Sequence, residues 1–462
     1  METALDLAVR NGTVVTTEGS MRLDVGIKQG RIVQLDGPMH AVRELDATGC
    51  LVLPGGIDMH VHLTARAGFD SAGEKGFVDD FYTGSLAAIA GGITTIGPMA
   101  FPEREGETLR QAAERDLSAA GTQAAVDYVV HPGFLTTDAN TLVDIATLAQ
   151  QGHRSVKTAT IGFDLGPGDL VRAIAVAGSL GLLTMIHCED QALIDYATNA
   201  LLDDGHGALE FYPQSRPDIT ELAAVDRAIA ICEITGAPIY LVHLSSARAL
   251  ESARRAKDRG LPVFVETRPI YLHLDDAVHQ QTDGGRFIGM PPVRTSADMA
   301  ALWAGIAEGS VHTVGSDHAP WSLPDKVDPA LDVATSRKGV ADLETMLPML
   351  YSEGVVPGRI SIQQFLAVTA TNPARLFGLY PRKGTIAVGS DADLLVLDPA
   401  ENRIVDGSTM QSRSGYSVYD GRRITGWPRF TVSGGDVVLD PDGLHAEPGR
   451  GHRLEQGPIS TW

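Results

Sequence analysis

Eight short apolar β runs, separated by amphipathic helical stretches, recur through the middle of the chain. In order, the runs are LPGGIDMH, GITTIGPM, AVDYVVHPG, RSVKTAT, GLLTMIHC, PIYLVHLS, LPVFVET and VHTVGSD. Stretches with helical periodicity, such as TLVDIATLAQQG and DITELAAVDRAIAICEITG, lie between them. Eight alternating units predict an α/β fold, a TIM-type (β/α)8 barrel over residues 54–382. In such a barrel the functional residues lie at the carboxyl ends of the strands.

Both ends of the chain carry a different pattern, made of short β segments broken by turn dipeptides. Residues 1–53 contain Asn-Gly, Gln-Gly and Asp-Gly turns, and residues 383–445 read as further short strands with turns. A small antiparallel sheet needs partner strands to close a core. We therefore expect one discontinuous β-sandwich domain built from 1–53 and 383–445. The polar, Gly- and Pro-rich stretch 446–462 is predicted to be a C-terminal tail, with packing on a neighbouring subunit as one option.

Charge and cysteine content restrict the partners and the compartment. The 462 residues include 37 Lys and Arg against 58 Asp and Glu, a formal net charge of −21, which disfavours nucleic acid and anionic membrane as partners. No run approaches the roughly 18 apolar residues of a membrane helix, and the N-terminus does not read as a secretory signal. Three scattered cysteines indicate a reducing compartment. We expect a cytoplasmic protein.

Residue types that bind metal ions occur where several of the predicted strands end. His60 and His62 are two residues apart on the first strand, so both imidazoles face the same side. Asp58 shares that face and is predicted to orient an imidazole. Two other histidines, His131 and His318, are predicted to be structural. The six candidate metal ligands are His60, His62, Lys157, His187, His243 and Asp317.

These six residue types together favour metal-assisted hydrolysis. Imidazole nitrogens suit zinc and leave a coordination position for water, although manganese, cobalt or iron are also options. Lys157, carboxylated by carbon dioxide, would become an anion that bridges two metal ions. Asp317 is predicted to act as general base and then as general acid. Each residue alone has a structural interpretation, such as filling the barrel mouth or forming an ion pair, so the prediction depends on the set.

Several longer motifs extend this pattern over nearly the whole chain. They are PGGIDMHVHL, HCED, VHLSS, PPVR, GSDHAP, LETMLPMLYSEGV and TATNPARLFGLYPRKGTIAVGSDADLLVLDP. The chain resembles the cyclic amidohydrolases of the hydantoinase/dihydropyrimidinase family. The resemblance implies a barrel with a discontinuous β-sandwich, assembly as a homotetramer or homodimer, and two divalent metal ions, usually zinc, bridged by carboxylated Lys157. It also implies hydrolysis of a cyclic amide or imide C–N bond, with a metal-bridging hydroxide as nucleophile and Asp317 as proton shuttle.

Four positions depart from the family where hydantoinases contact the substrate. Gly162 stands where a tyrosine is expected five residues after the bridging lysine, and Met290 replaces a serine or asparagine. Lys338 replaces an asparagine, and Arg268 replaces a cysteine or threonine. We predict that these four residues line a site for a cyclic substrate other than a standard hydantoin or dihydrouracil.

The two added cations suggest a substrate that carries a carboxylate, bound by Arg268 or Lys338. Alternatively, both cations pair with acidic neighbours such as Asp342 or Glu344. Allantoinase activity is a further alternative. Dihydroorotase activity is another, although Thr64 occupies the place where dihydroorotases usually carry an arginine. A non-catalytic scaffold protein of this family would lack metal ligands, whereas this chain keeps all six.

Overall fold

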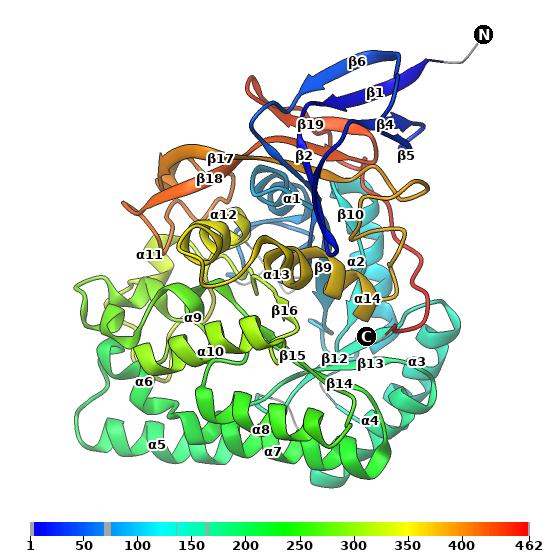
Figure 1. The fold of residues 1–462 in the computed structure, drawn as a ribbon. Coiled ribbons are helices and arrows are strands. Elements are labelled where there is room, and N and C mark those ends of the chain that lie inside the picture. The colour runs from blue at the N-terminus through cyan, green and yellow to red at the C-terminus, as the bar shows by residue number, and fades with distance from the viewer. Residues whose placement is uncertain (1–3, 69–74, 135, 163–165, 461–462) are drawn as a thin grey trace.

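The computed structural model describes residues 4–68, 75–134, 136–162 and 166–460, and its centre is a barrel of parallel strands (Figure 1). The barrel strands are β8 (Gly56–Val61), β9 (Ile93–Ala100), β10 (Asp127–Tyr128) continued by β11 (His131–Pro132), β12 (Ser155–Ala159), β13 (Leu183–His187), β14 (Ile239–Leu241), β15 (Val263–Thr267) and β16 (Thr313–Val314). Each of the eight apolar runs predicted from the sequence overlaps one barrel strand, with β10 and β11 together in the third run. All named pairs among them are parallel.

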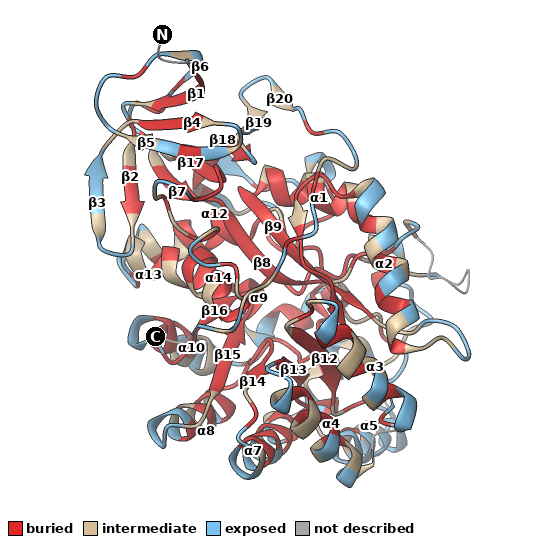
Figure 2. Cartoon of the chain, turned by 90° about the vertical axis from the view of Figure 1, so that its right-hand side faces the viewer, coloured by how far each residue is buried: buried red, intermediate tan, exposed pale blue. Residues whose placement is uncertain are grey.

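Two isolated parallel bridges close the barrel where the extended ladders stop. Gly133 pairs with Lys157 and so joins the third strand to the fourth, while Val61 pairs with His318 and joins the first strand to the end of the eighth. The barrel strands are buried on both faces, as a parallel sheet covered by helices requires (Figure 2).

Helices surround the barrel, and the exposed faces of several of them point away from it (Figure 2). The longer ones are α1 (Phe81–Ala90), α2 (Leu109–Gln123), α3 (Ala139–Gln150), α4 (Pro167–Ser179), α5 (Gln191–Asp203), α7 (Asp218–Thr235), α8 (Ala247–Asp258) and α10 (Ser296–Glu308). Side-chain caps start several of them: Asp80 accepts a hydrogen bond from Thr83 N before α1, and Thr295 accepts one from Asp298 N before α10. The short helices are α6 (Tyr212–Ser215), α9 (Pro269–His273), α11 (Leu323–Lys326), α12 (Met346–Leu350), α13 (Ile362–Leu366) and α14 (Asn372–Leu376).

Strands from both chain ends form two sheets above the barrel in Figure 1. One sheet has the order β5-β4-β1-β6 and the other β20-β19-β18-β17-β7-β2-β3. Their strands are β1 (Leu5–Arg10), β2 (Thr13–Thr16), β3 (Gly19–Arg22), β4 (Val25–Lys28), β5 (Arg31–Leu35), β6 (Ala41–Asp46), β7 (Leu51–Pro54), β17 (Leu394–Ile404), β18 (Arg423–Ser433), β19 (Asp436–Asp440) and β20 (Gly443–Leu444).

One hydrophobic core lies between these two sheets and combines residues from both termini. Leu7 and Ile27 of the first sheet pack in the same buried cluster as Val52, Leu394 and Val432 of the second. Strand β7 pairs antiparallel with β17, which comes more than 300 residues later in the chain. The predicted fold class, a TIM-type barrel with a discontinuous β-sandwich, is confirmed. The domain limits drawn from the sequence stay a prediction.

The segment predicted as a tail runs along its own barrel up to residue 460. Gly451 N donates to Ala124 O at 2.9 Å, and Leu454 N donates to Tyr128 O at 2.9 Å. Leu454 is buried in a core cluster that includes Met59 and Met185 of the barrel strands. These contacts attach the segment to its own barrel. Among the helices of the described ranges, none combines the length and apolar character needed to cross a bilayer.

Candidate active site

All six predicted metal ligands line one cavity of about 400 Å³ at the carboxyl ends of the barrel strands. They arrive there from separate parts of the sequence because β8, β12, β13, β14 and β16 end at the same rim. Lys157, His187 and His243 are almost fully buried. The structure therefore brings together residues that are up to 257 positions apart in sequence, from His60 to Asp317.

His60, His62 and Asp317 form the tightest part of this cluster. Asp317 Oδ1 lies 3.3 Å from His60 Nε2 and 3.0 Å from His62 Nε2. One donor atom from each residue falls within 4.8 Å of the other two, a spacing that suits a shared metal ion. His60 Nε2 is buried and has no hydrogen-bond partner among the described residues, so its lone pair is available to a cation.

His187 and His243 make a second nitrogen pair in the same cavity. His187 Nδ1 lies 2.9 Å from His243 Nε2, while His187 Nε2 lies 2.9 Å from Glu189 Oε2. A carboxylate beside one ring nitrogen keeps the proton there and turns the lone pair of the other nitrogen toward the cavity. Burial also lowers the pKa of both imidazoles, which favours the neutral form that binds metal.

Lys157 provides the amine of the site, from the middle of β12. Its side chain lines the cavity with the histidines and is nearly inaccessible to solvent. Burial lowers the pKa of Lys157 to about 8, although Asp317 and Glu266 act in the opposite direction. A lysine with this pKa is uncharged more often than a surface lysine, and the uncharged amine is the form that adds carbon dioxide.

Glu266 is a site residue that the sequence analysis missed. It lies in β15, next to the strand that precedes His243, and its Oε1 is 2.7 Å from His60 Nδ1 and accepts from His243 N at 3.0 Å. The Tyr240 hydroxyl donates to Oε2 at 2.8 Å. A buried carboxylate held in this way fixes the tautomer of His60. Its position at the end of the run LPVFVET was the signal that could have identified it.

Asp58 does not orient an imidazole, contrary to the prediction from its place two residues before His60. Its carboxylate accepts hydrogen bonds from the backbone N–H groups of His60, at 3.1 Å, and of Ser316, at 3.2 Å. Asp58 therefore ties the first barrel strand to the eighth just below the site. Burial raises the pKa of Asp58 to about 7.

Backbone strain marks two of the candidate ligands. His243 has φ 40° and Asp317 has φ 47°, in the left-handed region that non-glycine residues rarely adopt. The other three described non-glycine residues with positive φ lie near the strands of the β-sandwich, and each directly precedes a glycine. Strain of this kind, at the ends of β14 and β16, persists where the surrounding structure holds a functional geometry.

The donor set fits two divalent metal ions. Four imidazoles, one carboxylate and one lysine amine line the cavity, and the buried Nε2 of His60 makes no hydrogen bond within the described ranges. Glu266 lies within ion-pair distance of His60, and Glu189 lies within ion-pair distance of His187. A carboxylate beside the second ring nitrogen is common for metal-binding imidazoles.

Comparison with known proteins identifies the family of this chain. The model of the amidohydrolase family matches residues 51–438. This chain belongs to the amidohydrolase family. A D-hydantoinase from Rhizobium radiobacter is 36% identical over 444 residues, which cover 94% of this chain and 95% of that protein. The predicted membership in the hydantoinase/dihydropyrimidinase family is confirmed.

Solved structures give the same result for the fold of this amidohydrolase. A D-hydantoinase structure superposes with a TM-score of 0.94 at 34% identity and covers 99% of this chain and 100% of that one. A dihydropyrimidinase from Brevibacillus agri superposes with a TM-score of 0.93 at 31% identity, over 98% of this chain and 99% of that one. The chain is an enzyme of this family over essentially its full length.

Three of the four predicted substrate-contact residues line the amidohydrolase cavity. Met290, Lys338 and Gly162 line it from loop segments. Gly162 has φ 71°, its N–H donates to Gln191 Oε1 at 2.9 Å, and no described residue other than its chain neighbours lies within 4 Å of where a Cβ would stand. The cavity is therefore open at the position where family members carry a tyrosine.

Arg268 occupies a different place from the one predicted. It is fully buried, does not line the cavity, and its Nη1 donates to Asp317 Oδ2 at 2.6 Å. Although burial raises the pKa of Asp317, the Arg268 guanidinium and the nearby histidines hold it well below its usual range. Arg268 thus faces the carboxylate of a candidate ligand, which leaves Asp317 Oδ1 turned toward the histidines.

Asp342 and Glu344, the acidic neighbours considered for Arg268 and Lys338, form hydrogen bonds to other groups. Asp342 accepts from the Thr345 and Tyr419 hydroxyls, and Glu344 accepts from Gln411 N at 2.8 Å. Neither carboxylate lies within ion-pair distance of Lys338 in the described structure. The acidic-neighbour interpretation is therefore not supported for Lys338, and Arg268 pairs with Asp317 instead.

Two further histidines support the site from behind. His131 Nδ1 lies 2.6 Å from the Ser155 hydroxyl beneath the barrel mouth, and His318 Nε2 lies 2.9 Å from Asp79 Oδ2. His318 Nδ1 also accepts from Asp342 N at 3.2 Å. Neither histidine lines the cavity, in agreement with the structural role expected for both.

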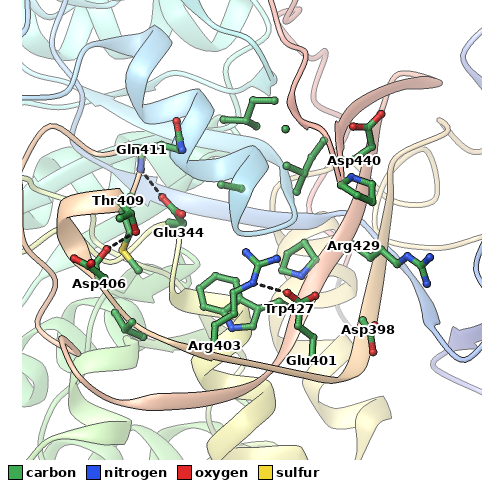
Figure 3. A pocket seen from close by; sticks show the side chains of 18 of the residues that line it. Glu344, Asp398, Glu401, Arg403, Asp406, Thr409, Gln411, Trp427, Arg429 and Asp440 are labelled. Atoms are coloured by element: carbon green, nitrogen blue, oxygen red, sulfur yellow. Dashed lines mark hydrogen bonds and ion pairs between the residues drawn. The ribbon is translucent and has the colours of Figure 1, made fainter.

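A larger cavity of about 720 Å³ lies beside the β-sandwich, away from the histidines (Figure 3). Glu344, Arg403 and Trp427 line it, and Arg403 Nε donates to Glu401 Oε1 at 2.6 Å. Burial raises the pKa of Glu344 to about 7. None of the candidate metal ligands faces this cavity, so its size does not make it the reaction site.

Proposed function

We propose that this amidohydrolase opens a cyclic amide or imide by hydrolysis of a ring C–N bond. The observation that supports this most strongly is the convergence of the six candidate ligands on one cavity, with buried carboxylates behind His60 and His187. The printed names of the relatives, D-hydantoinase and dihydropyrimidinase, favour a small ring amide as the substrate class.

In this proposal His60, His62 and Asp317 would hold one divalent ion, and His187 and His243 would hold a second. Lys157, carboxylated on Nζ, would bridge the two, and zinc is the metal that the imidazole-rich set favours. When bound, the ions polarise the ring carbonyl and make water acidic enough to attack near neutral pH.

Asp317 moves the proton in this scheme. Water adds its oxygen to the ring carbonyl carbon, and Asp317 takes the proton that the water loses. The ring C–N bond then breaks, Asp317 returns the proton to the leaving nitrogen, and an open-chain acid is formed. Arg268, at 2.6 Å from Oδ2, holds this carboxylate in place. The resemblance also supports assembly as a homotetramer or homodimer.

The test is a hydrolysis screen with metal-loaded, bicarbonate-treated protein. The rings are hydantoin, dihydrouracil, allantoin, dihydroorotate, succinimide and a simple lactam, so that the related allantoinase and dihydroorotase activities are included. We expect turnover of at least one ring and none in the Lys157→Ala variant. Full turnover in that variant, or no turnover of any ring by protein with two bound metal ions, would overturn the proposal.

A further inference from the structure

We propose that the ring opened by this enzyme carries an anionic substituent, a carboxylate, which Lys338 and Arg216 bind at the cavity wall. The inference rests on the proposed function and adds the class of substrate. Lys338 is one of the positions that depart from the family, and Arg216 was not singled out in the sequence. Both side chains line the cavity that contains the six candidate ligands.

Lys338 has no acidic partner in the described structure. Its Nζ donates to the backbone carbonyl of Ala334 at 3.1 Å, and it forms no ion pair there. Asp332 and Glu189 attract it only from a distance. A half-buried ammonium group without a carboxylate beside it is costly, and a ligand anion would offset that cost.

Arg216 supplies a second cation to the same wall. It is 8% exposed, and its Nη1 donates to Glu189 Oε2 at 2.6 Å. Burial and the proximity of Arg216 lower the pKa of Lys338 to about 8, which shows that the two cations repel each other. An anion between them would remove this repulsion and gain charge-assisted hydrogen bonds from one or both.

The loop that carries Lys338 is fixed before any ligand arrives. The buried Lys326 Nζ donates to Arg337 O at 2.7 Å and Gly339 O at 2.8 Å, the residues on either side of Lys338. The same Nζ donates to Ile288 O at 2.5 Å, which ties this loop to the wall segment that precedes Met290. A binding group on a fixed loop loses little conformational freedom when it binds a ligand.

Trp321 adds a further anchor and helps to define where the ring lies. Its Nε1 donates to Lys338 O at 2.9 Å, and its ring packs edge-on against Phe77 at 5.3 Å between centroids. Phe77, Ile161 and Met290 make the nearby lining apolar. A flat ring would pack on these side chains with its carboxylate turned toward Lys338 and Arg216.

The experiment compares hydantoin-5-acetate with hydantoin-5-acetamide, which has nearly the same shape but no charge. KM and kcat are measured for both rings with wild type, Lys338→Gln and Lys28→Gln. Lys28 lies on β4 of the β-sandwich and gives the matched loss of one positive charge. Binding of both compounds is also measured by calorimetry on metal-loaded protein, so that affinity is known even for a ring that is not opened.

We expect wild type to prefer the acetate and Lys338→Gln to reduce that preference roughly 10- to 100-fold, mostly through KM or Kd, as loss of a charged hydrogen bond predicts. Lys28→Gln should keep the wild-type ratio. Equal affinity of wild type for acetate and acetamide, or an unchanged ratio in Lys338→Gln, would overturn the inference. A retained binding preference without ring opening would overturn the proposed hydrolysis of these rings and leave the anion site standing.

Discussion

The two sides of the active-site cavity are built in different ways. On the histidine side, donors on barrel strands are buried and held by carboxylates, as His60 is held by Glu266 at 2.7 Å. In contrast, Gly162, Met290 and Lys338, which line the same cavity, stand on loops and are exposed or half-buried. The first group contains the six ligands that the resemblance predicts, whereas the loop residues are three of the positions where the sequence departs from the expected pattern.

This difference separates chemistry from specificity. A metal ligand that moves by a fraction of an ångström loses its function, so its supports lie in the most rigid part of the barrel. A loop residue can change without disturbing the strands, so the substrate-facing wall is free to vary. Arg268 belongs with the first group by its contacts, although the sequence placed it with the second.

The largest expected effect comes from removing the proposed bridge. Lys157→Ala deletes the only amine among the six donors that line the cavity, so we expect bound metal to fall below two ions per chain and turnover to be lost. Metal analysis of purified protein and the ring-opening assay check this. Lys28→Ala is the control, and two tightly bound ions with normal turnover in Lys157→Ala would contradict the role.

Asp317→Asn should lower kcat about 100- to 10,000-fold, the usual range for loss of a general acid–base group. The change keeps the size of the side chain and removes the carboxylate that lies 3.0 Å from His62 Nε2. Asp398→Asn, at the cavity of Figure 3, is the matched control. A drop of less than tenfold, with metal content intact, would assign the proton transfer to another group.

Glu266→Gln should weaken metal binding about 10- to 100-fold, the range found for residues that orient metal-binding imidazoles. Glutamine keeps an oxygen near His60 Nδ1 but loses the charge. Competition with a chelator measures the affinity, and Glu251→Gln on the surface of α8 serves as the control. If both variants hold metal equally, Glu266 only supports the fold.

The preference for an anionic ring should depend on pH. Lys338 carries its positive charge below its pKa of about 8 and loses it above that value. Bound carboxylate stabilises the charged form, so the KM for hydantoin-5-acetate should rise roughly tenfold relative to the acetamide as the pH increases beyond about 8. Both rings share every other pH dependence of the enzyme. The ratio of their KM values therefore reports the charge of Lys338 alone. A KM ratio that does not change with pH would exclude Lys338 as the group that binds the carboxylate.

The smallest expected effect is on stability. Gly162→Ala places a Cβ in open space but at φ 71°, which should cost about 1 kcal/mol in the free energy of unfolding. Gly168→Ala in α4 has equally open space without a positive φ, and there we expect no loss or a gain of about 0.5–1 kcal/mol. Denaturant unfolding of both variants measures the difference, and equal losses would contradict the backbone explanation.

Local patterns were sufficient to predict the strands and the candidate ligands. Each apolar run overlaps a barrel strand because burial on both faces requires continuous apolar sequence. The ligands could be selected because they stand at the ends of those runs. Glu266 also ends such a run and was missed, because a single glutamate at a strand end has no spacing motif to distinguish it.

The sequence by itself determined the barrel and the pairing of the two termini, because apolar periodicity and turn residues are local features of the chain. It also determined the family, because the longer motifs are continuous stretches of sequence. Tertiary structure alone decided which charges meet. Arg268 and Asp317 are 49 positions apart yet pair at 2.6 Å, and Arg216 and Lys338 come to one cavity wall from distant loops. Such pairs depend on how loops pack above the strands, and no period or motif in the sequence encodes that packing.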